Sequence, residues 1–312
     1  MGSSLDLFVN LGPAGELGAL RERVARLDAV GVAGVFVSDH LFVSLGPERA
    51  KAYRPDDPIV VLAAVAALSP RLAVGTLVAN VGLLHPALVL RHFAQLAALA
   101  GGERVIAGLG AGWNAEEFES LGQAMPSHSA RLDRLAEACR LARALFDQGV
   151  ASLEGSHVVA RGLPLAPRPA SPPRLLLGGG SDRLLDIAGR YADVVDLNGS
   201  SRRHSLGRKT PLRDDRIRRR STTVDDLAAS AARVRAAAAA ASRPCPRFSV
   251  TLDSVSFEPA ADETLDACPY LLAGEPAKLR DTLAERAARI GLGAIIAPES
   301  ADLARLRNEV LR

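Results

Sequence analysis

Arg104 to Asn114 read RVIAGLGAGWN, an apolar run that breaks into glycines. Gly108, Gly110 and Gly112 are spaced by two, and the chain's single tryptophan, Trp113, follows them. This pattern predicts a buried strand that ends in a glycine-rich turn. Missing Cβ atoms there allow positive φ angles and let a flat ligand or another backbone come close. A purely structural strand-to-helix turn is the alternative interpretation.

Segments typical of strands and helices alternate along the rest of the chain. The expected strands cover residues 6–12, 34–38, 71–80, 104–114 with its turn, 173–180, 192–199, 247–258 and 293–298. The expected helices cover residues 15–30, 58–69, 86–100, 130–146, 183–192, 223–241, 275–290 and 301–312. Strands that are each followed by a helix predict an α/β fold, the (β/α)8 TIM barrel. A doubly wound open sheet is the alternative, because the first and last strands are short.

The chain is expected to form one domain over residues 1–312, because no change in composition marks a linker and single barrels of this length are common. Two segments interrupt the alternation. Residues 150–172 are rich in Pro and Gly and contain a possible hairpin at 153–163. Residues 201–221 form a basic loop with nine Arg or Lys against two Asp, either a solvated loop or an electrostatic cover for an anionic ligand.

Composition argues against several classes of protein. Hydrophobic residues make up 48% and charged residues 23%, which is typical of a soluble globular protein. No apolar run reaches the roughly 18 residues of a spanning helix, and the N-terminus lacks a signal-peptide pattern, so a cytoplasmic location is expected. The three cysteines are widely spaced without a CxxC motif, which favours reduced thiols over a metal site or disulfides. The basic loop has no interleaved aromatic residues, which argues against nucleic-acid binding.

Candidate functional residues lie at the carboxyl ends of the expected strands, where TIM barrels place their active sites. They are Asn10, Asp39, His40, Asn80, Trp113, Asn114, Gly178, Gly179, Gly180 and Asn198. The set lacks a nucleophile paired with a base, a cluster of metal-binding carboxylates and a lysine suited to a Schiff base. Amides, one imidazole, one indole and glycine turns favour the binding of a cofactor.

The chain resembles the luciferase-like monooxygenase superfamily, and most closely its branch of probable coenzyme F420-dependent oxidoreductases. The matching segments are VSDHL (37–41), DDPIVVLAAVAALSPRLAVGTLV (56–78), HPALVLRHFAQLAALAGGERVIAGLGAGWNAEEFESLG (85–122), RLDRLAEACRLARALF (131–146), PPRLLLGGGSDRLLDIAGRYADVVDLN (172–198) and AGEPAKLRDTLAERAARIG (273–291). They cover nearly the whole chain. The GLGAGW block and the LLLGGG block followed by AD are specific in combination.

The resemblance implies roles for particular residues. His40 matches a histidine that faces the deazaflavin ring and assists proton transfer, with a capping histidine as the alternative. Leu77 and Val78 match a strand bulge where relatives often have a cis peptide behind the ring. Gly178, Gly179 and Gly180 match a phosphate cradle at a helix N-terminus. The other residues expected at the cofactor are Asp39, Asn80, Gly110, Gly112, Trp113 and Asn198. Some F420-dependent relatives have an acidic residue at the position of Trp113. The indole of Trp113 could instead stack on the substrate or on the ring, or simply fill the mouth of the barrel.

The function implied is hydride transfer between coenzyme F420 and a small organic substrate, with the basic loop facing the coenzyme's phosphate and oligoglutamate tail. An FMN-dependent monooxygenase that uses oxygen is one alternative. A non-catalytic flavin- or deazaflavin-binding barrel is another. Because the alanine-rich helices at 59–68 and 89–100 carry few charges, and relatives commonly dimerise there, a homodimer is expected.

Overall fold

The computed structural model describes residues 5–43, 56–199, 219–259 and 268–311. Most of the basic loop at 201–221 lies outside these residues. So do most of residues 42–54, a variable loop that we expect to line the substrate pocket. The chain divides into two compact units. The first consists of Met1–Gly12, Glu22–Phe36 and Gly178–Arg312, and the second of Pro13–Arg21 and Val37–Leu177. The expectation of one domain stays a prediction.

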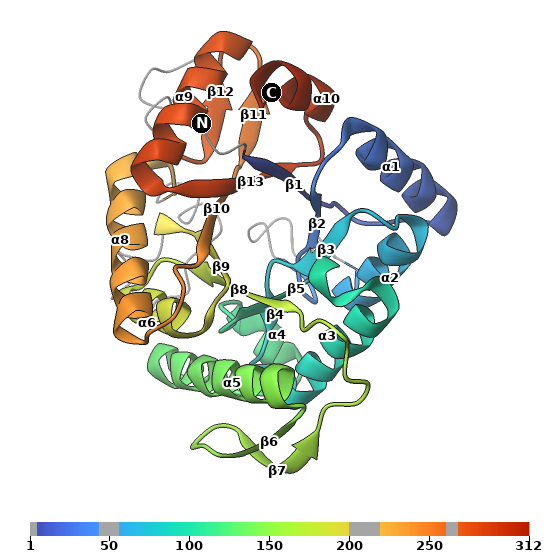
Figure 1. Ribbon diagram of the computed structural model, residues 1–312, viewed down its shortest axis with the longest axis vertical. Coiled ribbons are helices and arrows are strands. Elements are labelled where there is room, and N and C mark those ends of the chain that lie inside the picture. Colours follow the sequence, from blue (N-terminus) through green and yellow to red (C-terminus); the bar gives the residue numbers. More distant parts are fainter. Residues whose placement is uncertain (1–4, 44–55, 200–218, 260–267, 312) are drawn as a thin grey trace. The chain divides into compact units, whose positions relative to one another are not determined.

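Parallel strands form the core of the first unit (Figure 1). Strand β1 (Asp6–Asn10) pairs with β2 (Gly34–Val37) on one side and with β13 (Leu292–Pro298) on the other. Strand β10 (Arg247–Thr251) joins β13 to β9 (Val194–Leu197). Their side chains are almost entirely buried, as expected of parallel strands covered by helices.

Helices follow these strands in the first unit. They are α1 (Leu17–Val30, in this unit from Glu22), α6 (Asp182–Tyr191), α8 (Val224–Ala240), α9 (Pro276–Ile290) and the short α10 (Leu303–Arg305). Helices α6 and α8 pack so closely that a Cβ added at Gly189 would lie only 2.6 Å from the Ala237 side chain. Figure 1 shows the two side by side. Thr223 and Asp226 form a capping box that begins α8.

Parallel strands also form the core of the second unit. Strand β5 (Val105–Gly110) pairs with β3 (Ala73–Thr76), β4 (Ala79–Asn80) and the start of β8 (Arg174–Gly179). The helices are α2 (Pro58–Leu68), α3 (Pro86–Ala100), α4 (Ala115–Ser120) and α5 (His128–Gln148). Strands β6 (Val150–Glu154) and β7 (Val159–Pro164) form the predicted antiparallel hairpin. The alternation of strand and helix predicted from the sequence is therefore present in each unit.

Local chemistry explains where several elements begin. Asp57 accepts hydrogen bonds from the backbone N–H groups of Ile59 and Val60, and Pro58 occupies the first turn of α2. The ring of His85 accepts the N–H of Ala87 at the start of α3. Ser181 stands at the N-cap of α6, but its side chain makes no capping hydrogen bond.

Three expected elements differ in detail. The strand expected at 71–80 is split into β3 and β4 by a cis peptide between Leu77 and Val78. The strand expected at 247–258 is split into β10 and β11 (Ser254–Ser256). The backbone N–H of Leu252 donates to the carbonyl of Ile296 in β13, whereas the N–H of Asp253 donates to the carbonyl of Tyr270, just before β12 (Leu271–Ala273). Strand β11 then pairs with β12. The helix expected at 301–312 is only α10 followed by a π turn, η5 (Leu306–Val310). Helix α4 and strand β12 were not predicted.

Candidate functional site

The predicted residues after β2 and β4 lie together in the second unit. Asp39 accepts a hydrogen bond from the backbone N–H of Asn80 at 2.9 Å. The side chain of Asn80 in turn accepts the N–H of Gly82 at 2.9 Å. Burial raises the pKa of Asp39, and the Asn80 hydrogen bond and the His40 ring oppose that rise only in part. This chain of bonds joins the carboxyl ends of the two strands.

Neighbouring protein atoms leave no room for a Cβ at the three glycines of the RVIAGLGAGWN segment. A Cβ at Gly108 would lie 1.9 Å from the carbonyl oxygen of Thr76, and one at Gly110 would lie 2.4 Å from Val78 Cγ2. Gly112 has a φ of 74°, and its Cβ would lie 2.5 Å from Asn80 Oδ1. Both uses predicted for these glycines are thus observed: a positive φ angle at Gly112, and the close approach of protein atoms at all three positions.

His40 is held between an acid and an indole. Its Nδ1 lies 3.1 Å from Oε1 of Glu117, and Trp113 meets its ring edge-on at a centroid distance of 5.4 Å. Glu117 is only 1% exposed, whereas Trp113 is 52% exposed. Glu117 also accepts the backbone N–H of Leu41 at 2.7 Å. An imidazole ring, a buried carboxylate and an exposed indole are therefore grouped at the end of β2.

The contact between Glu117 and His40 was not predicted from the sequence. Asn114 caps α4 by accepting the N–H of Glu116 and donates from its Nδ2 to the Phe42 carbonyl at 3.0 Å. Glu117 therefore falls in the first turn of α4, on the side facing the end of β2. The cap pattern was visible in the sequence, but the direction of the turn was not.

The predicted glycine cradle lies in the first unit, together with Asn198. A Cβ at Gly180 would lie 1.7 Å from the carbonyl oxygen of Asn198, and the N–H of Asn198 donates to the Gly179 carbonyl at 3.1 Å. Gly179 has a φ of 147°. Helix α6 follows directly, and the backbone N–H groups of its first turn have no side-chain cap from Ser181. The turn thus leads into a helix N-terminus of the kind that binds anions.

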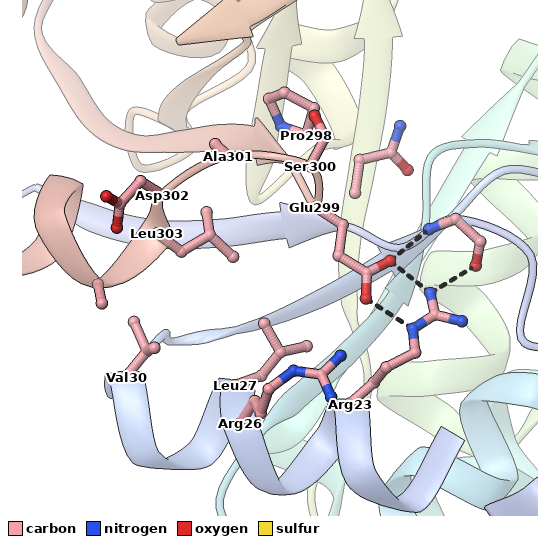
Figure 2. Close-up of a pocket in the computed structure, with 13 residues that line it drawn as sticks. Arg23, Arg26, Leu27, Val30, Pro298, Glu299, Ser300, Ala301, Asp302 and Leu303 are labelled. Atoms are coloured by element: carbon pink, nitrogen blue, oxygen red, sulfur yellow. Dashed lines mark hydrogen bonds and ion pairs between the residues drawn. The ribbon is translucent and has the colours of Figure 1, made fainter. Parts of the chain in front are cut away.

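Asn10, another predicted strand-end residue, lines a cavity of about 690 Å³ in the first unit. Figure 2 shows Arg23 and Glu299 meeting on its wall. Arg23 Nε donates to Glu299 Oε1 at 2.6 Å, and Glu299 Oε2 accepts the N–H of Gly12 at 3.1 Å. The buried Oδ1 of Asn10 has no hydrogen-bond partner among the described residues. None of the residues of the His40 group lines this cavity.

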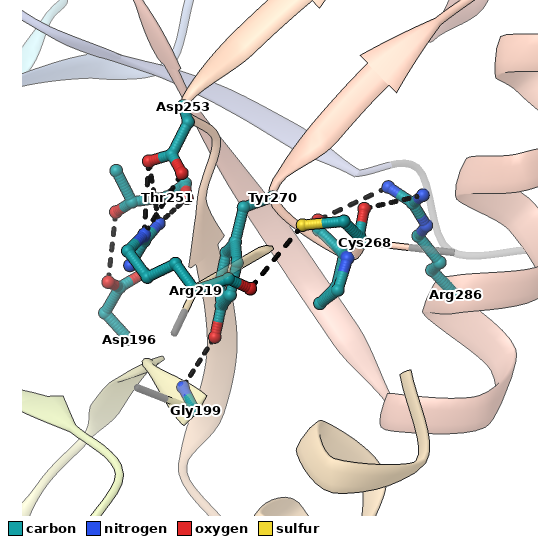
Figure 3. A network of polar contacts seen from close by, with 9 residues as sticks. Asp196, Gly199, Arg219, Thr251, Asp253, Cys268, Tyr270 and Arg286 are labelled. Atoms are coloured by element: carbon teal, nitrogen blue, oxygen red, sulfur yellow. Dashed lines mark hydrogen bonds and ion pairs between the residues drawn. The ribbon is translucent and has the colours of Figure 1, made fainter. Parts of the chain in front are cut away.

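A polar network, also in the first unit, surrounds Tyr270 (Figure 3). The hydroxyl of Tyr270 accepts the N–H of Gly199 at 2.5 Å, and the guanidinium of Arg219 lies 3.8 Å from the centre of its ring. Arg219 also pairs with Asp253 at 3.0 Å. Nearby, Ser249 and Thr251 donate to the buried Asp196 carboxylate. Tyr270 therefore contacts residues on both sides of segment 200–218.

Two absences hold for the described residues. Within residues 5–43, 56–199, 219–259 and 268–311, no group of three or more His, Cys, Asp or Glu side chains is placed to hold a metal ion. No helix in the described part of the chain is long and apolar enough to cross a membrane. The predicted cytoplasmic location stays a prediction.

The family model described as luciferase-like monooxygenase matches residues 4–222. The chain belongs to the luciferase-like monooxygenase family. This confirms the resemblance inferred from the motifs around His40 and Gly110. The matched region contains all of the predicted site residues.

Relatives within the luciferase-like family differ in activity. An F420-dependent glucose-6-phosphate dehydrogenase of Kineococcus radiotolerans is 30% identical over 177 residues, which are 56% of this chain and 51% of that protein. The pyrimidine monooxygenase RutA of Cronobacter turicensis is 28% identical over 213 residues, which are 68% of this chain and 49% of that protein. The chain spans about half the length of these curated relatives. F420-dependent enzymes and monooxygenases are both represented among them.

A solved structure establishes the luciferase-like fold over the whole chain. The coenzyme F420-dependent tetrahydromethanopterin reductase from Methanopyrus kandleri matches with a TM-score of 0.75 at 13% identity, covering 98% of each chain. The predicted (β/α)8 TIM barrel is thereby confirmed, and the alternative of a doubly wound sheet is wrong.

Proposed function

We propose that the protein is an F420-dependent oxidoreductase that acts on a small organic substrate. The observation that carries this proposal is the group at the end of β2, where the His40 ring lies between the buried Glu117 and the exposed indole of Trp113. An imidazole can donate or accept a proton near neutral pH, which reduction or oxidation of a polar double bond requires. The F420-dependent relative supports the choice of coenzyme.

The chemistry of the residues proposed to bind the coenzyme fits a deazaflavin. Trp113 offers a flat apolar surface to a ring system, and the turn at Gly178, Gly179 and Gly180 leads into the first turn of α6, which can bind a phosphate. When bound in its reduced form, F420 would supply a hydride. His40 would move a proton at the substrate, and Trp113 would shield the imidazole from water. Roles at the coenzyme are also proposed for Asp39, Leu77, Val78, Asn80, Gly110, Gly112 and Asn198.

An FMN-dependent monooxygenase is the second candidate. The family's name and the pyrimidine monooxygenase relative favour it. Trp113 stands where some F420-dependent relatives have an acid, and this also favours it. A reduced flavin that reacts with oxygen would need the same aromatic surface and the same anion-binding helix N-terminus. The two candidate functions therefore differ in the coenzyme and in the use of oxygen. They share the residues proposed to bind that coenzyme.

The deciding experiment is to titrate the purified protein with F420 and with FMN side by side, following ligand fluorescence at low and moderate salt. Micromolar or tighter binding of F420, with weak binding of FMN, would support the proposal. A preference for FMN accompanied by oxygen uptake would overturn it. Affinity for F420 that falls with salt would further support a role for the basic loop at 201–221, most of which lies outside the described residues.

A homodimer is proposed as well. Helices α2 and α3 carry exposed apolar side chains, among them Val60 and Leu99, which a second copy could cover. Light scattering at micromolar protein concentration tests this, and a monomeric mass would overturn it.

A further inference from the structure

The hydrogen bonds of Glu117 constrain the position of the proton on the His40 ring. Oε1 of Glu117 accepts the N–H of Leu41 at 2.7 Å and lies 3.1 Å from Nδ1 of His40. An ionised carboxylate only accepts hydrogen bonds, so the ring nitrogen that faces it must be the donor. The neutral imidazole then carries its proton on Nδ1. Its Nε2 is left as the nitrogen with a free lone pair.

We propose that Glu117 is the positioning residue for His40. Glu117 selects the Nδ1–H tautomer and holds the ring so that Nε2 is the atom that exchanges a proton with the substrate. The assignment of Nε2 to catalysis rests on the proposed function, whereas the tautomer can be tested in the protein alone. A hydrogen bond at one ring nitrogen commonly sets the role of the other in this way.

The surroundings of the ring support this role. The peptide N–H of Leu41 and the imidazole of His40 come from consecutive residues and bond the same carboxylate oxygen, so both backbone and ring are fixed after β2. Trp113 packs edge-on against the ring at an angle of 72°, which restricts its rotation. The Asp39 carboxylate also interacts electrostatically with His40, but its hydrogen bond is accepted from the backbone N–H of Asn80. Glu117 is thus the acid in direct contact with the ring.

A different role for Glu117 would be purely structural, as the acceptor for the Leu41 N–H. In Glu117→Gln, either the carbonyl or the amide can stand in the place of Oε1. The carbonyl would keep both contacts, whereas the amide would donate to an unprotonated Nδ1 and give up the hydrogen bond from Leu41. The preference for one tautomer would then be lost without a large loss of packing. Glu116→Gln is the matched control, because it removes an exposed carboxylate from the same turn of α4.

The test is nitrogen NMR of the protein labelled with 15N-histidine, recorded without coenzyme at neutral pH. His40→Gln identifies the His40 signals among those of the six histidines. We expect protonated Nδ1 and unprotonated Nε2 in the wild type and in Glu116→Gln, and a mixture of tautomers in Glu117→Gln. A wild-type proton on Nε2 overturns the proposal, even if the Glu117 variant does not fold. An unchanged tautomer in a folded Glu117→Ala variant, which leaves neither a carboxylate nor an amide beside Nδ1, also overturns it.

Kinetics provide the second arm, with whichever coenzyme binds. We expect Glu117→Gln to lower kcat by roughly tenfold or more at little change in KM, because general acid–base catalysis contributes about 10²–10⁴-fold and the ring would be misdirected only part of the time. A change confined to KM would contradict positioning. If neither coenzyme supports turnover, the proposed function fails while the NMR result still decides the tautomer.

Discussion

Glu137 accepts the backbone N–H of Val158 at 2.7 Å, so that a side chain of α5 closes the turn between β6 and β7. The same carboxylate accepts the N–H groups of Ser156 at 2.9 Å and His157 at 2.8 Å. Although burial acts to raise the pKa of Glu137, these three hydrogen bonds outweigh it and lower the pKa. One ionised side chain therefore holds the hairpin turn.

Glu137→Gln should destabilise the protein by about 2 kcal/mol, because a single carbonyl oxygen cannot replace both carboxylate oxygens and buried N–H groups lose their partners. Urea unfolding at pH 7 measures the difference in free energy. A glutamate whose pKa is lower in the folded than in the unfolded protein stabilises the fold at pH values above its unfolded pKa of about 4.3. That stabilisation is lost as the pH falls through the folded pKa. The difference between wild type and variant should therefore shrink below about pH 4. A constant difference would show that the charge is not involved.

Asp196→Asn should change the pH dependence of stability in the opposite direction. Burial raises the pKa of Asp196 to about 6, with the Ser249 and Thr251 hydroxyls opposing the rise. Its protonated form stabilises below the unfolded pKa of about 3.9, and that contribution is lost as pH rises through about 6. Between pH 4 and 7 the wild type should lose roughly 3 kcal/mol relative to the variant. Denaturant titrations at both pH values measure it, and parallel curves would contradict the raised pKa.

Gly112→Ala should cost more stability than Gly122→Ala. Both glycines have positive φ angles, 74° and 71°, so both substitutions strain the backbone by about 1 kcal/mol. Only at Gly112 would the new Cβ meet a side chain, 2.5 Å from Asn80 Oδ1, whereas nothing lies within 4 Å of the Cβ position at Gly122. The extra cost should be about 1–3 kcal/mol, as in other overpacked sites. Equal melting temperatures for the two variants would contradict the close contact.

Trp113→Ala should separate binding from stability. The indole is 52% exposed, so its loss should change the free energy of unfolding by less than about 1 kcal/mol. Coenzyme affinity should fall roughly tenfold if the indole contributes about 1 kcal/mol or more of stacking to the ring. Leu121→Ala, at a position 50% exposed, is the control and should leave affinity unchanged. Unaltered affinity in Trp113→Ala would mean that the indole does not contact the coenzyme.

Local sequence signals predicted the fold well where they determine structure directly. Pro86 at a first helical turn and Gly101 after the last turn mark the bounds of α3, and the predicted helix at 86–100 is confirmed residue for residue. The burial of β5 also follows from its apolar run. Elements of this kind depend on neighbours in sequence.

The missed features depend on partners far apart in the chain. Glu117 and His40 are 77 residues apart, and no local pattern relates them. Strand β10 ends where Asp253 turns to bond Tyr270, a contact that alternation of apolar residues does not encode. The resemblance to relatives implied a cis peptide at Leu77–Val78, which is present, whereas its role beside a ring stays a prediction.

Tyr270 has a consequence for how this protein can vary. Its hydroxyl holds Gly199 and its ring holds Arg219, so one side chain fixes the entry and the exit of the intervening segment. Position 270 should therefore tolerate little variation, because a smaller side chain would give up the contacts with Gly199 and with Arg219 at once.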